Sequence, residues 1–287
     1  MKIKKYFLEF FFISIFFFIF KIIGYKNASN LGEKIGKIFG PLFRSSLKVK
    51  KNLENSNIGN SNEERERIVK NMWGNYGRIF ADYMYIKNFR NENLFKNIEV
   101  VGENILDEIK NAKEPVIFIS GHFNNFELMA LYLEKSGIDL AAIYRPLNNK
   151  FLNPLMEKIR IQYICKKQIK KGISGTKEIL KHFRNGTSIA LMIDQRVSEG
   201  IKSKFFNNLA LTTTIPAQFV KKFKCKIVPV YIERKNKHQF ILEILRPINF
   251  SKDEDIESIT MNLNKVLEEL IRRKPDQWIW THSRWKQ

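Results

Sequence analysis

A chain of 287 residues that is 44% hydrophobic can bury a substantial core and suits one catalytic domain with an appendage. Its 50 Lys and Arg against 29 Asp and Glu give a net charge of +21, which favours an anionic partner such as a membrane surface, nucleic acid or an acidic substrate; a solvated basic surface is the alternative. The two cysteines, Cys165 and Cys225, lie far apart without metal-ligand spacing, which argues against thiol chemistry and indicates a reducing compartment.

Residues 1–24 predict a membrane anchor. A basic start precedes an apolar run from Phe10 to Phe20 that only Ser14 interrupts. At about −0.3 to −0.6 kcal/mol for each central Phe or Ile, insertion of this run into a bilayer is favourable by roughly 3 to 6 kcal/mol. A secretory signal is the alternative, but no A-x-A-like cleavage site follows. Residues 6–23 are marginal in length for one span, so a helix in the membrane surface stays open.

Residues 25–95 are predicted to form a helical, membrane-proximal segment. Gly36 to Phe43 combines aromatic and basic residues, which is typical of a segment that lies at a membrane surface. Glu63 to Ile86 is predicted to be a helix because its apolar residues recur at spacings of three or four. Asp82 on this helix is interpreted as a solvated or capping residue.

Residues 96–287 alternate between strand and helix patterns. We predict strands at Ile98–Val101, Val116–Ser120, Leu140–Tyr144, Ser188–Ile193, Ile227–Ile232 and Gln239–Leu245. We predict helices at Asn104–Asn111, Phe126–Lys135, Lys150–Ile161, Gly175–Phe183, Ile215–Phe223 and Glu257–Arg273. This alternation predicts an α/β domain with a mostly parallel central sheet, flanked by helices, that binds ligands beyond the carboxyl ends of its strands.

The stretch Pro115 to Leu133 carries the first candidate site. An apolar run breaks at a Ser-Gly pair, and a helical pattern follows, so His122 is expected in the turn that ends a buried strand. With Asn124 or Asn125 as N-cap, Glu127 falls in the first helical turn and can reach back to the imidazole. A carboxylate that fixes the tautomer of a histidine makes it a competent general base. A structural histidine is the alternative, and one His with one Glu does not complete a metal site.

Two further predicted strands end on polar residues. Arg145 follows Leu140–Tyr144 directly and precedes a proline, so it is placed to bind phosphate or carboxylate with two hydrogen bonds. Asp194 and Gln195 follow the apolar strand at Ser188, and Asp194 could orient the arginine or a sugar hydroxyl. The alternatives are a surface arginine and a turn aspartate. His282 lies among tryptophans and is interpreted as part of a packed aromatic lid.

Five blocks in order carry a resemblance to a known family. GHFNNFE is similar to the H-x-x-x-x-D/E block of the lysophospholipid acyltransferase superfamily. Together with IYRPLNN, MIDQR, FFNNLALTTTIPAQFV and WIWTHSRWK, it resembles the late acyltransferases of lipid A biosynthesis, over Pro115 to Lys286. The resemblance implies His122 as the base, Glu127 as its partner, and an acceptor site lined by Arg145, Asp194 and Gln195.

The same resemblance implies the reaction and the partners. The expected donor is acyl-carrier protein, and the acceptor is a hydroxyl of a lipid A precursor, among membrane lipids of the bacterial inner membrane, with the catalytic domain facing the cytoplasm. Neither a cofactor, a metal nor nucleic acid is expected. Another membrane glycolipid or a lysophospholipid stays open as acceptor, and a non-catalytic binder of anionic lipid or nucleic acid is the second alternative. The F-P-E-G-T block of glycerolipid acyltransferases is absent, which argues against a glycerol-phosphate acceptor.

The chain departs from the family pattern in one block. The family usually has glycine after the paired phenylalanines, whereas Asn207 follows Phe206 here. It also usually has Gly-Pro-Ala before the next helix, whereas Ile215 precedes the Pro-Ala pair here. The geometry of this loop is therefore open at the level of sequence.

Overall fold

A central sheet of seven strands organises the chain in the computed structural model, which describes residues 2–43, 46–91 and 93–286. The strands are β1 Ile98–Val101, β2 Ile117–Ser120, β3 Leu140–Tyr144, β4 Lys167–Lys170, β5 Ser188–Met192, β8 Ile227–Lys235 and β9 Gln239–Ile244, with β6 Ile201–Phe205 and β7 Asn208–Thr212 in a separate hairpin. The order across the large sheet is β1-β9-β8-β2-β5-β3-β4. Only β8 and β9 pair antiparallel in it, so the predicted mostly parallel sheet is confirmed.

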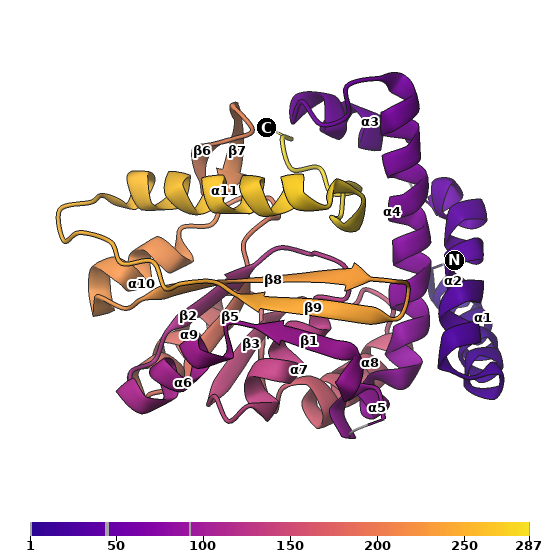
Figure 1. Ribbon diagram of the computed structural model, residues 1–287, viewed down its shortest axis with the longest axis horizontal. Helices are drawn as coiled ribbons and strands as arrows, with labels where there is room; N and C mark the ends of the chain where they lie inside the picture. The colour runs from indigo at the N-terminus through magenta and orange to yellow at the C-terminus, as the bar shows by residue number, and fades with distance from the viewer. Residues whose placement is uncertain (1, 44–45, 92, 287) are drawn as a thin grey trace.

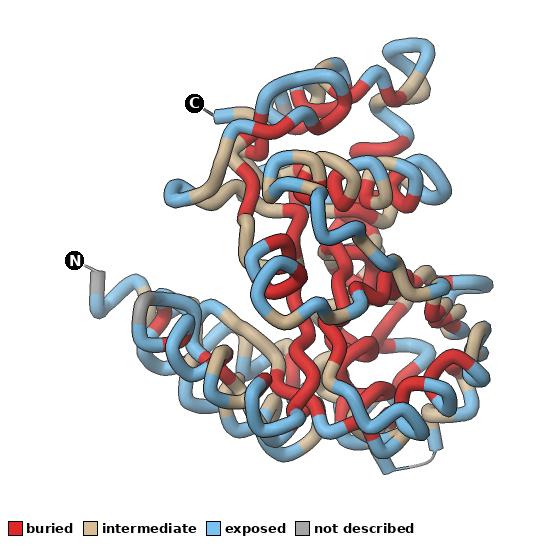
Figure 2. Tube along the Cα trace, turned by 90° about the vertical axis from the view of Figure 1, so that its left-hand side faces the viewer, coloured by how far each residue is buried: buried red, intermediate tan, exposed pale blue. Residues whose placement is uncertain are grey.

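Helices flank this sheet on both faces. They are α1 Lys2–Ile23, α2 Tyr25–Phe43, α3 Ser46–Asn55, α4 Asn62–Asp82, α5 Ile86–Asn91, α6 Glu103–Ala112, α7 Glu127–Lys135, α8 Leu152–Ile159, α9 Ile173–Arg184, α10 Ile215–Phe223 and α11 Ile256–Arg273. Figure 1 shows α11 over one face and α6 and α7 over the other. A continuous apolar strand buried on both faces requires such cover, and every residue of β2 is buried. The buried strands run through the middle of the molecule in Figure 2.

The N-terminal helices lie together at one side of the sheet (Figure 1). Among the described residues, α1 is the one helix that is long and apolar enough to cross a membrane, which fits the predicted anchor. Phe17 and Phe20 pack on Phe80 of α4, with ring centroids 5.0 and 5.8 Å apart. α2 packs closely on α4 because glycines meet there: a Cβ on Gly77 would collide with the backbone of Gly32.

Three strands are absent from the sequence prediction. β4 contains only one apolar residue in four, so its pattern does not indicate a strand. The β6–β7 hairpin is joined by Phe206 and Asn207, whose φ angles are +50° and +60°. Two successive left-handed residues make the tight turn typical of a hairpin, and asparagine tolerates this conformation. Asn207 in place of the family's glycine is therefore compatible with the turn.

Candidate active site

His122 and Asp194 meet at the carboxyl edge of the sheet because β2 and β5 are parallel neighbours. Ser120 pairs with Met192 at the end of this ladder, so two residues further along each strand lie side by side. Tyr144 ends β3, the neighbour of β5 on its other side, and Arg145 follows it. The three predicted strand ends therefore share one edge of the sheet.

The Asp194 carboxylate holds the His122 imidazole in one tautomer. His122 Nδ1 lies 2.8 Å from Oδ1 of Asp194, and the backbone N–H of His122 donates to Oδ2 at 2.9 Å. Trp278 Nε1 donates to the same Oδ2 at 2.8 Å. Burial by itself raises the pKa of Asp194, but His122 and these donors lower that pKa to about 2. An ionised carboxylate only accepts, so Nδ1 of the neutral ring carries the proton and Nε2 presents its lone pair, which faces the Gln195 side-chain amide at 3.3 Å.

Glu127 is hydrogen-bonded to other side chains, and not to the imidazole as predicted from the sequence, in the part of the chain that the structure describes. Its Oε1 accepts from the Tyr83 hydroxyl and from Arg160, at 2.9 Å from Nε and 2.6 Å from Nη2. Among the described residues no hydrogen bond joins Glu127 to His122, whose Nδ1 is occupied by Asp194. The carboxylate that holds the imidazole is therefore that of Asp194, which lies 72 residues from His122 along the chain, and not that of the nearby Glu127.

Arg160 and Tyr83 are site residues that the sequence did not indicate. Arg160 opens a π-helical turn, Arg160–Ile164, at the end of α8, and such turns are frequent at functional sites. Burial and the adjacent Glu127 raise the pKa of Tyr83, so its phenol remains a neutral donor. The predicted helix Lys150–Ile161 includes the arginine, but no residue pattern distinguishes it from a surface cation.

Several residues of this site line a cavity of about 460 Å³. His122, Glu127, Arg145, Arg160 and Gln195 contribute to its wall. The Gln195 side-chain amide lies 3.3 Å from His122 Nε2. Arg145 is exposed and has no ion pair within the described part of the chain, whereas Arg160 is bound to Glu127. The predicted orientation of Arg145 by Asp194 is not found, because the carboxylate is occupied by His122 and Trp278.

The rest of the cavity wall is mainly apolar, with a second histidine. Its apolar side chains are Phe126, Met129, Ala130, Ala142, Ile143, Pro146, Leu147, Ala190, Leu191, Met192, Val197 and Ile215. His282 also lines it, so this residue does more than pack among tryptophans. Burial lowers the pKa of His282 to about 4, and the cations around it act in the same direction, so its imidazole is neutral at pH 7.

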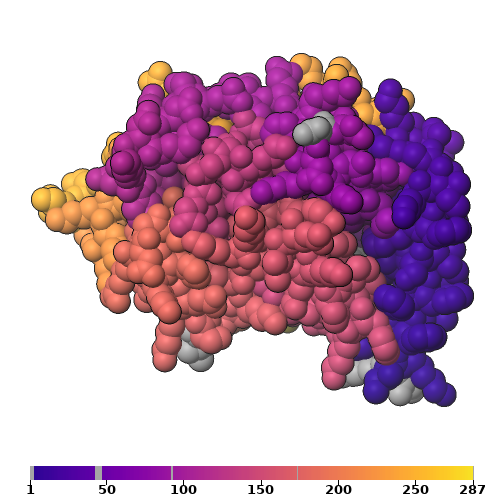
Figure 3. All heavy atoms as spheres, turned by 90° about the horizontal axis from the view of Figure 1, so that it is seen from below, coloured from indigo at the N-terminus to yellow at the C-terminus, as the bar shows by residue number. Residues whose placement is uncertain are grey.

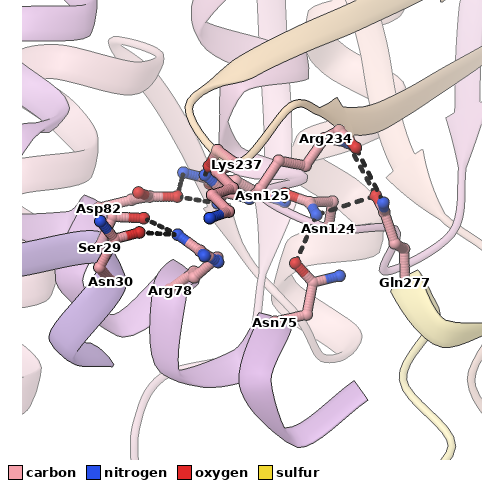
Figure 4. Close-up of polar contacts among 10 residues, drawn as sticks. All are labelled: Ser29, Asn30, Asn75, Arg78, Asp82, Asn124, Asn125, Arg234, Lys237 and Gln277. Carbon is pink, nitrogen blue, oxygen red and sulfur yellow. Dashed lines mark hydrogen bonds and ion pairs between the residues drawn. The ribbon is translucent and has the colours of Figure 1, made fainter. Parts of the chain in front are cut away.

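The turn that carries His122 is fixed by hydrogen bonds of side-chain amides (Figure 4). Asn124 has a φ of +38° and donates from its side chain to Asn75 of α4, at 2.8 Å, and to Gln277, at 2.9 Å. Its backbone N–H donates to the Gln277 carbonyl at 2.7 Å. Asn124 or Asn125 was predicted as the N-cap of the next helix. This prediction is wrong, because α7 begins at Glu127 and its N-cap is Phe126.

Asp82 is fully buried, so its interpretation as a solvated or capping residue is wrong. It pairs with Arg234 of β8 and accepts a hydrogen bond from Asn125 at 3.1 Å. Figure 4 shows this pair between α4, the β8–β9 hairpin and the His122 turn. Its partner lies 152 residues away along the chain, which is why local helical spacing could not reveal the contact.

Comparisons with known proteins identify the family of this chain. The model of the bacterial lipid A biosynthesis acyltransferase family matches residues 1–287. The lipid A biosynthesis acyltransferase 2 of Shigella flexneri is 24% identical over 86% of this chain and 80% of its own length. The Escherichia coli myristoyltransferase and lauroyltransferase of lipid A biosynthesis are 22% and 24% identical, over 86% and 89% of this chain and 77% and 84% of their own lengths. This chain therefore belongs to the family of bacterial lipid A biosynthesis acyltransferases and is an acyltransferase.

Proposed function

We propose that this enzyme transfers a fatty acyl chain from acyl-carrier protein to a hydroxyl of a lipid A precursor at the bacterial inner membrane, from the cytoplasmic side. The observation that carries the proposal is the His122–Asp194 pair at the wall of a largely apolar cavity, in a chain of this family. Family membership rules out the non-catalytic alternative. The proposal concerns the donor, the acceptor and the roles of the residues.

His122 is the general base in this proposal. Its Nε2 takes the proton of the acceptor hydroxyl as the oxygen attacks the thioester carbonyl of the donor. The tetrahedral intermediate then expels the carrier thiolate, which receives the proton back from the imidazolium. The products are an ester and a free carrier thiol, so no covalent enzyme intermediate is needed. Asp194 stabilises the imidazolium and keeps Nε2 available for the proton.

Glu127 remains a proposed catalytic residue, but its role changes. Its Oε2 has no hydrogen bond within the described part of the chain, while Oε1 is held by Arg160 and Tyr83. A carboxylate fixed by one oxygen can present the other to a substrate hydroxyl in the cavity. Arg145, exposed at the rim, is the proposed contact for a phosphate of the acceptor, and Gln195 for a polar group beside Nε2.

A transfer assay tests the proposal directly. The purified chain is mixed with acyl-carrier protein that bears a labelled acyl group, and the acceptors are a lipid A precursor, another membrane glycolipid and a lysophospholipid. Mass spectrometry is expected to show one acyl mass added to the lipid A precursor and release of free carrier. Transfer only to one of the other lipids would contradict the proposed acceptor, and hydrolysis alone would contradict the proposed transfer.

The basic surface predicts a salt-sensitive donor interaction. The net charge of +21 attracts an acidic carrier, and this attraction acts over the Debye length, which falls from about 10 Å at 0.1 M salt to about 3 Å at 1 M. We expect the KM for acyl-carrier protein to rise several-fold over this range while kcat changes little. An uncharged acyl thioester is the control, since its KM should not follow salt. A salt-independent KM for the carrier would count against the proposed donor.

A further inference from the structure

Helix α4 holds two consecutive residues of the turn that carries His122 (Figure 4). The Asn124 side chain donates to Oδ1 of Asn75 at 2.8 Å. The Asn125 side chain donates to Oδ2 of Asp82 at 3.1 Å. Asn75 and Asp82 are seven residues apart, so they lie on the same side of α4, about 10 Å from each other along its axis. The turn is therefore attached to α4 at two separate points.

Arg234 of β8 connects these two attachments. Its guanidinium pairs with the Asp82 carboxylate. Its backbone N–H donates to Oε1 of Gln277 at 2.7 Å, and Gln277 Nε2 donates back to its carbonyl at 3.0 Å. The same Oε1 accepts from the Asn124 side chain at 2.9 Å. A continuous set of contacts thus runs from Asp82 through Arg234 to the turn.

Asp82, Asn125 and Arg234, which we call the α4–hairpin cluster, are closed off from solvent. Asp82 and Asn125 are fully buried, and Arg234 is 7% exposed. Tyr25 at the start of α2 contacts the ring of His238 in the hairpin, with centroids 5.7 Å apart. Figure 3 shows the N-terminal helices, in indigo, packed against the rest of the domain. The described lining of the 460 Å³ cavity includes no member of the cluster, so any effect on acyl transfer must pass through other residues.

The hydrogen bonds of the cluster are incomplete, which argues against a mainly stabilising role. Oδ1 of Asp82 and Oδ1 of Asn125 are buried, and neither has a hydrogen-bond partner in the described part of the chain. A buried polar atom without a partner lowers the free energy of unfolding. Packed apolar side chains in place of a buried ion pair are often neutral or stabilising. The cluster is therefore better explained by the position that it gives to the segments it joins.

We propose that the α4–hairpin cluster is a set of positioning residues for His122. It holds the turn where Nδ1 of His122 lies 2.8 Å from Asp194 and the backbone N–H lies 2.9 Å from the same carboxylate. This inference rests on the proposed role of His122 as the base. Both contacts go to one carboxylate at the end of β5, so a shift of the turn weakens both at once. A displacement of about 1 Å in a catalytic group costs on the order of 10²-fold in rate.

Asn125→Ala in the full-length protein tests the proposal. This change detaches the turn from Asp82 and leaves the ion pair with Arg234 in place. We expect kcat for transfer from acyl-carrier protein to the lipid acceptor to fall about 10- to 100-fold, while the KM for the carrier stays within about twofold. Asp82→Asn should cause a similar loss, and it should also lower the free energy of unfolding because Arg234 stays buried without its partner. If Asp82→Asn does not fold, Asn125→Ala alone decides.

Arg78→Gln is the matched control. Arg78 is a buried cation on α4, one turn before Asp82, and it pairs with Glu33 of α2. Its other hydrogen bonds within the described residues also go to α2, at Ser29 and Asn30. Its replacement should lower the free energy of unfolding in urea and leave kcat of the folded protein unchanged. A loss of kcat like that of Asn125→Ala would show that any buried polar contact of α4 has this effect, which would overturn the inference.

The His122→Ala background separates positioning from a loss of folded protein. Without an imidazole to misplace, Asn125→Ala should change the remaining rate by less than about twofold. An equal loss in both backgrounds would overturn the inference, because a smaller folded fraction lowers every rate by the same factor. Unchanged kcat in folded Asn125→Ala would overturn it as well. Near-normal transfer by His122→Ala alone is a different result: it removes the proposed base, and the inference with it.

Discussion

Replacement of His122 with alanine is expected to lower kcat for acyl transfer by about 10²- to 10⁴-fold, the usual contribution of a general base. The imidazole lines the cavity, and the Asp194 carboxylate orients it by accepting a hydrogen bond from Nδ1. Its side chain is mostly buried, at 18% exposed, but it borders the cavity, so alanine leaves space that opens into this cavity. The measurement is the rate of acyl transfer from saturating acyl-carrier protein to the lipid acceptor.

The His122→Ala protein must first be shown to fold and to bind its partners as the wild type does. Circular dichroism and vesicle binding should match those of the wild type, and the KM for the carrier should change little, since in the proposed mechanism the imidazole acts on the acceptor hydroxyl. His238→Gln is a matched control, because His238 lies in the β8–β9 turn outside the cavity lining. Near-normal transfer by a folded His122→Ala protein would falsify the assignment of the base.

Replacement of Asp194 with asparagine is expected to reduce kcat by about 10²- to 10⁴-fold through the wrong tautomer. Two N–H groups, from the His122 backbone and from Trp278, point at Oδ2 and require an oxygen there. The amide NH₂ of the variant must then face Nδ1. It donates to Nδ1, so the ring proton moves to Nε2, and the base loses its lone pair.

A double-variant cycle separates this role from a structural one. If Asp194 acts through the imidazole, the double variant His122→Ala with Asp194→Asn should transfer acyl groups about as slowly as the slower single variant. Additive losses would instead indicate an independent role for the carboxylate. Glu127→Gln provides the comparison, since this carboxylate contacts Arg160 and not the imidazole. A larger loss in Glu127→Gln than in Asp194→Asn would restore the dyad that the sequence predicted.

The sheet is the part of the fold that the sequence predicts best. β1 and β3 have the predicted bounds because short apolar runs between polar turns leave little choice of structure. β4 and the β6–β7 hairpin were not predictable in the same way. Their strands mix lysine and asparagine with apolar residues, and the hairpin turn lacks the usual glycine. Their pairing depends on neighbours that the local pattern does not contain.

In the candidate site too, the local sequence predicts where single residues lie, but not which distant residues they meet. The sequence places His122 and Asp194 each at the end of a strand, but the strand order decides that these two strands are neighbours. Without that order, Glu127 is the nearest carboxylate in the chain and therefore the natural partner. Arg160 was not predicted because its local sequence does not distinguish it from a solvent-exposed arginine on a helix. Asp82 was misread because its partner, Arg234, is in a distant hairpin.

The residues that hold the His122 turn in place come from the C-terminal end of the chain, which is synthesised last. The turn is held by Gln277, and the carboxylate of Asp194 is held by Trp278, both of which the ribosome makes long after α1. An emerging chain therefore exposes its apolar first helix well before Gln277 and Trp278, which hold the His122 turn and Asp194, have been made. If His122 is the base, we expect acyl transfer to begin only after these last residues have been made, when α1 is already free to reach a lipid surface.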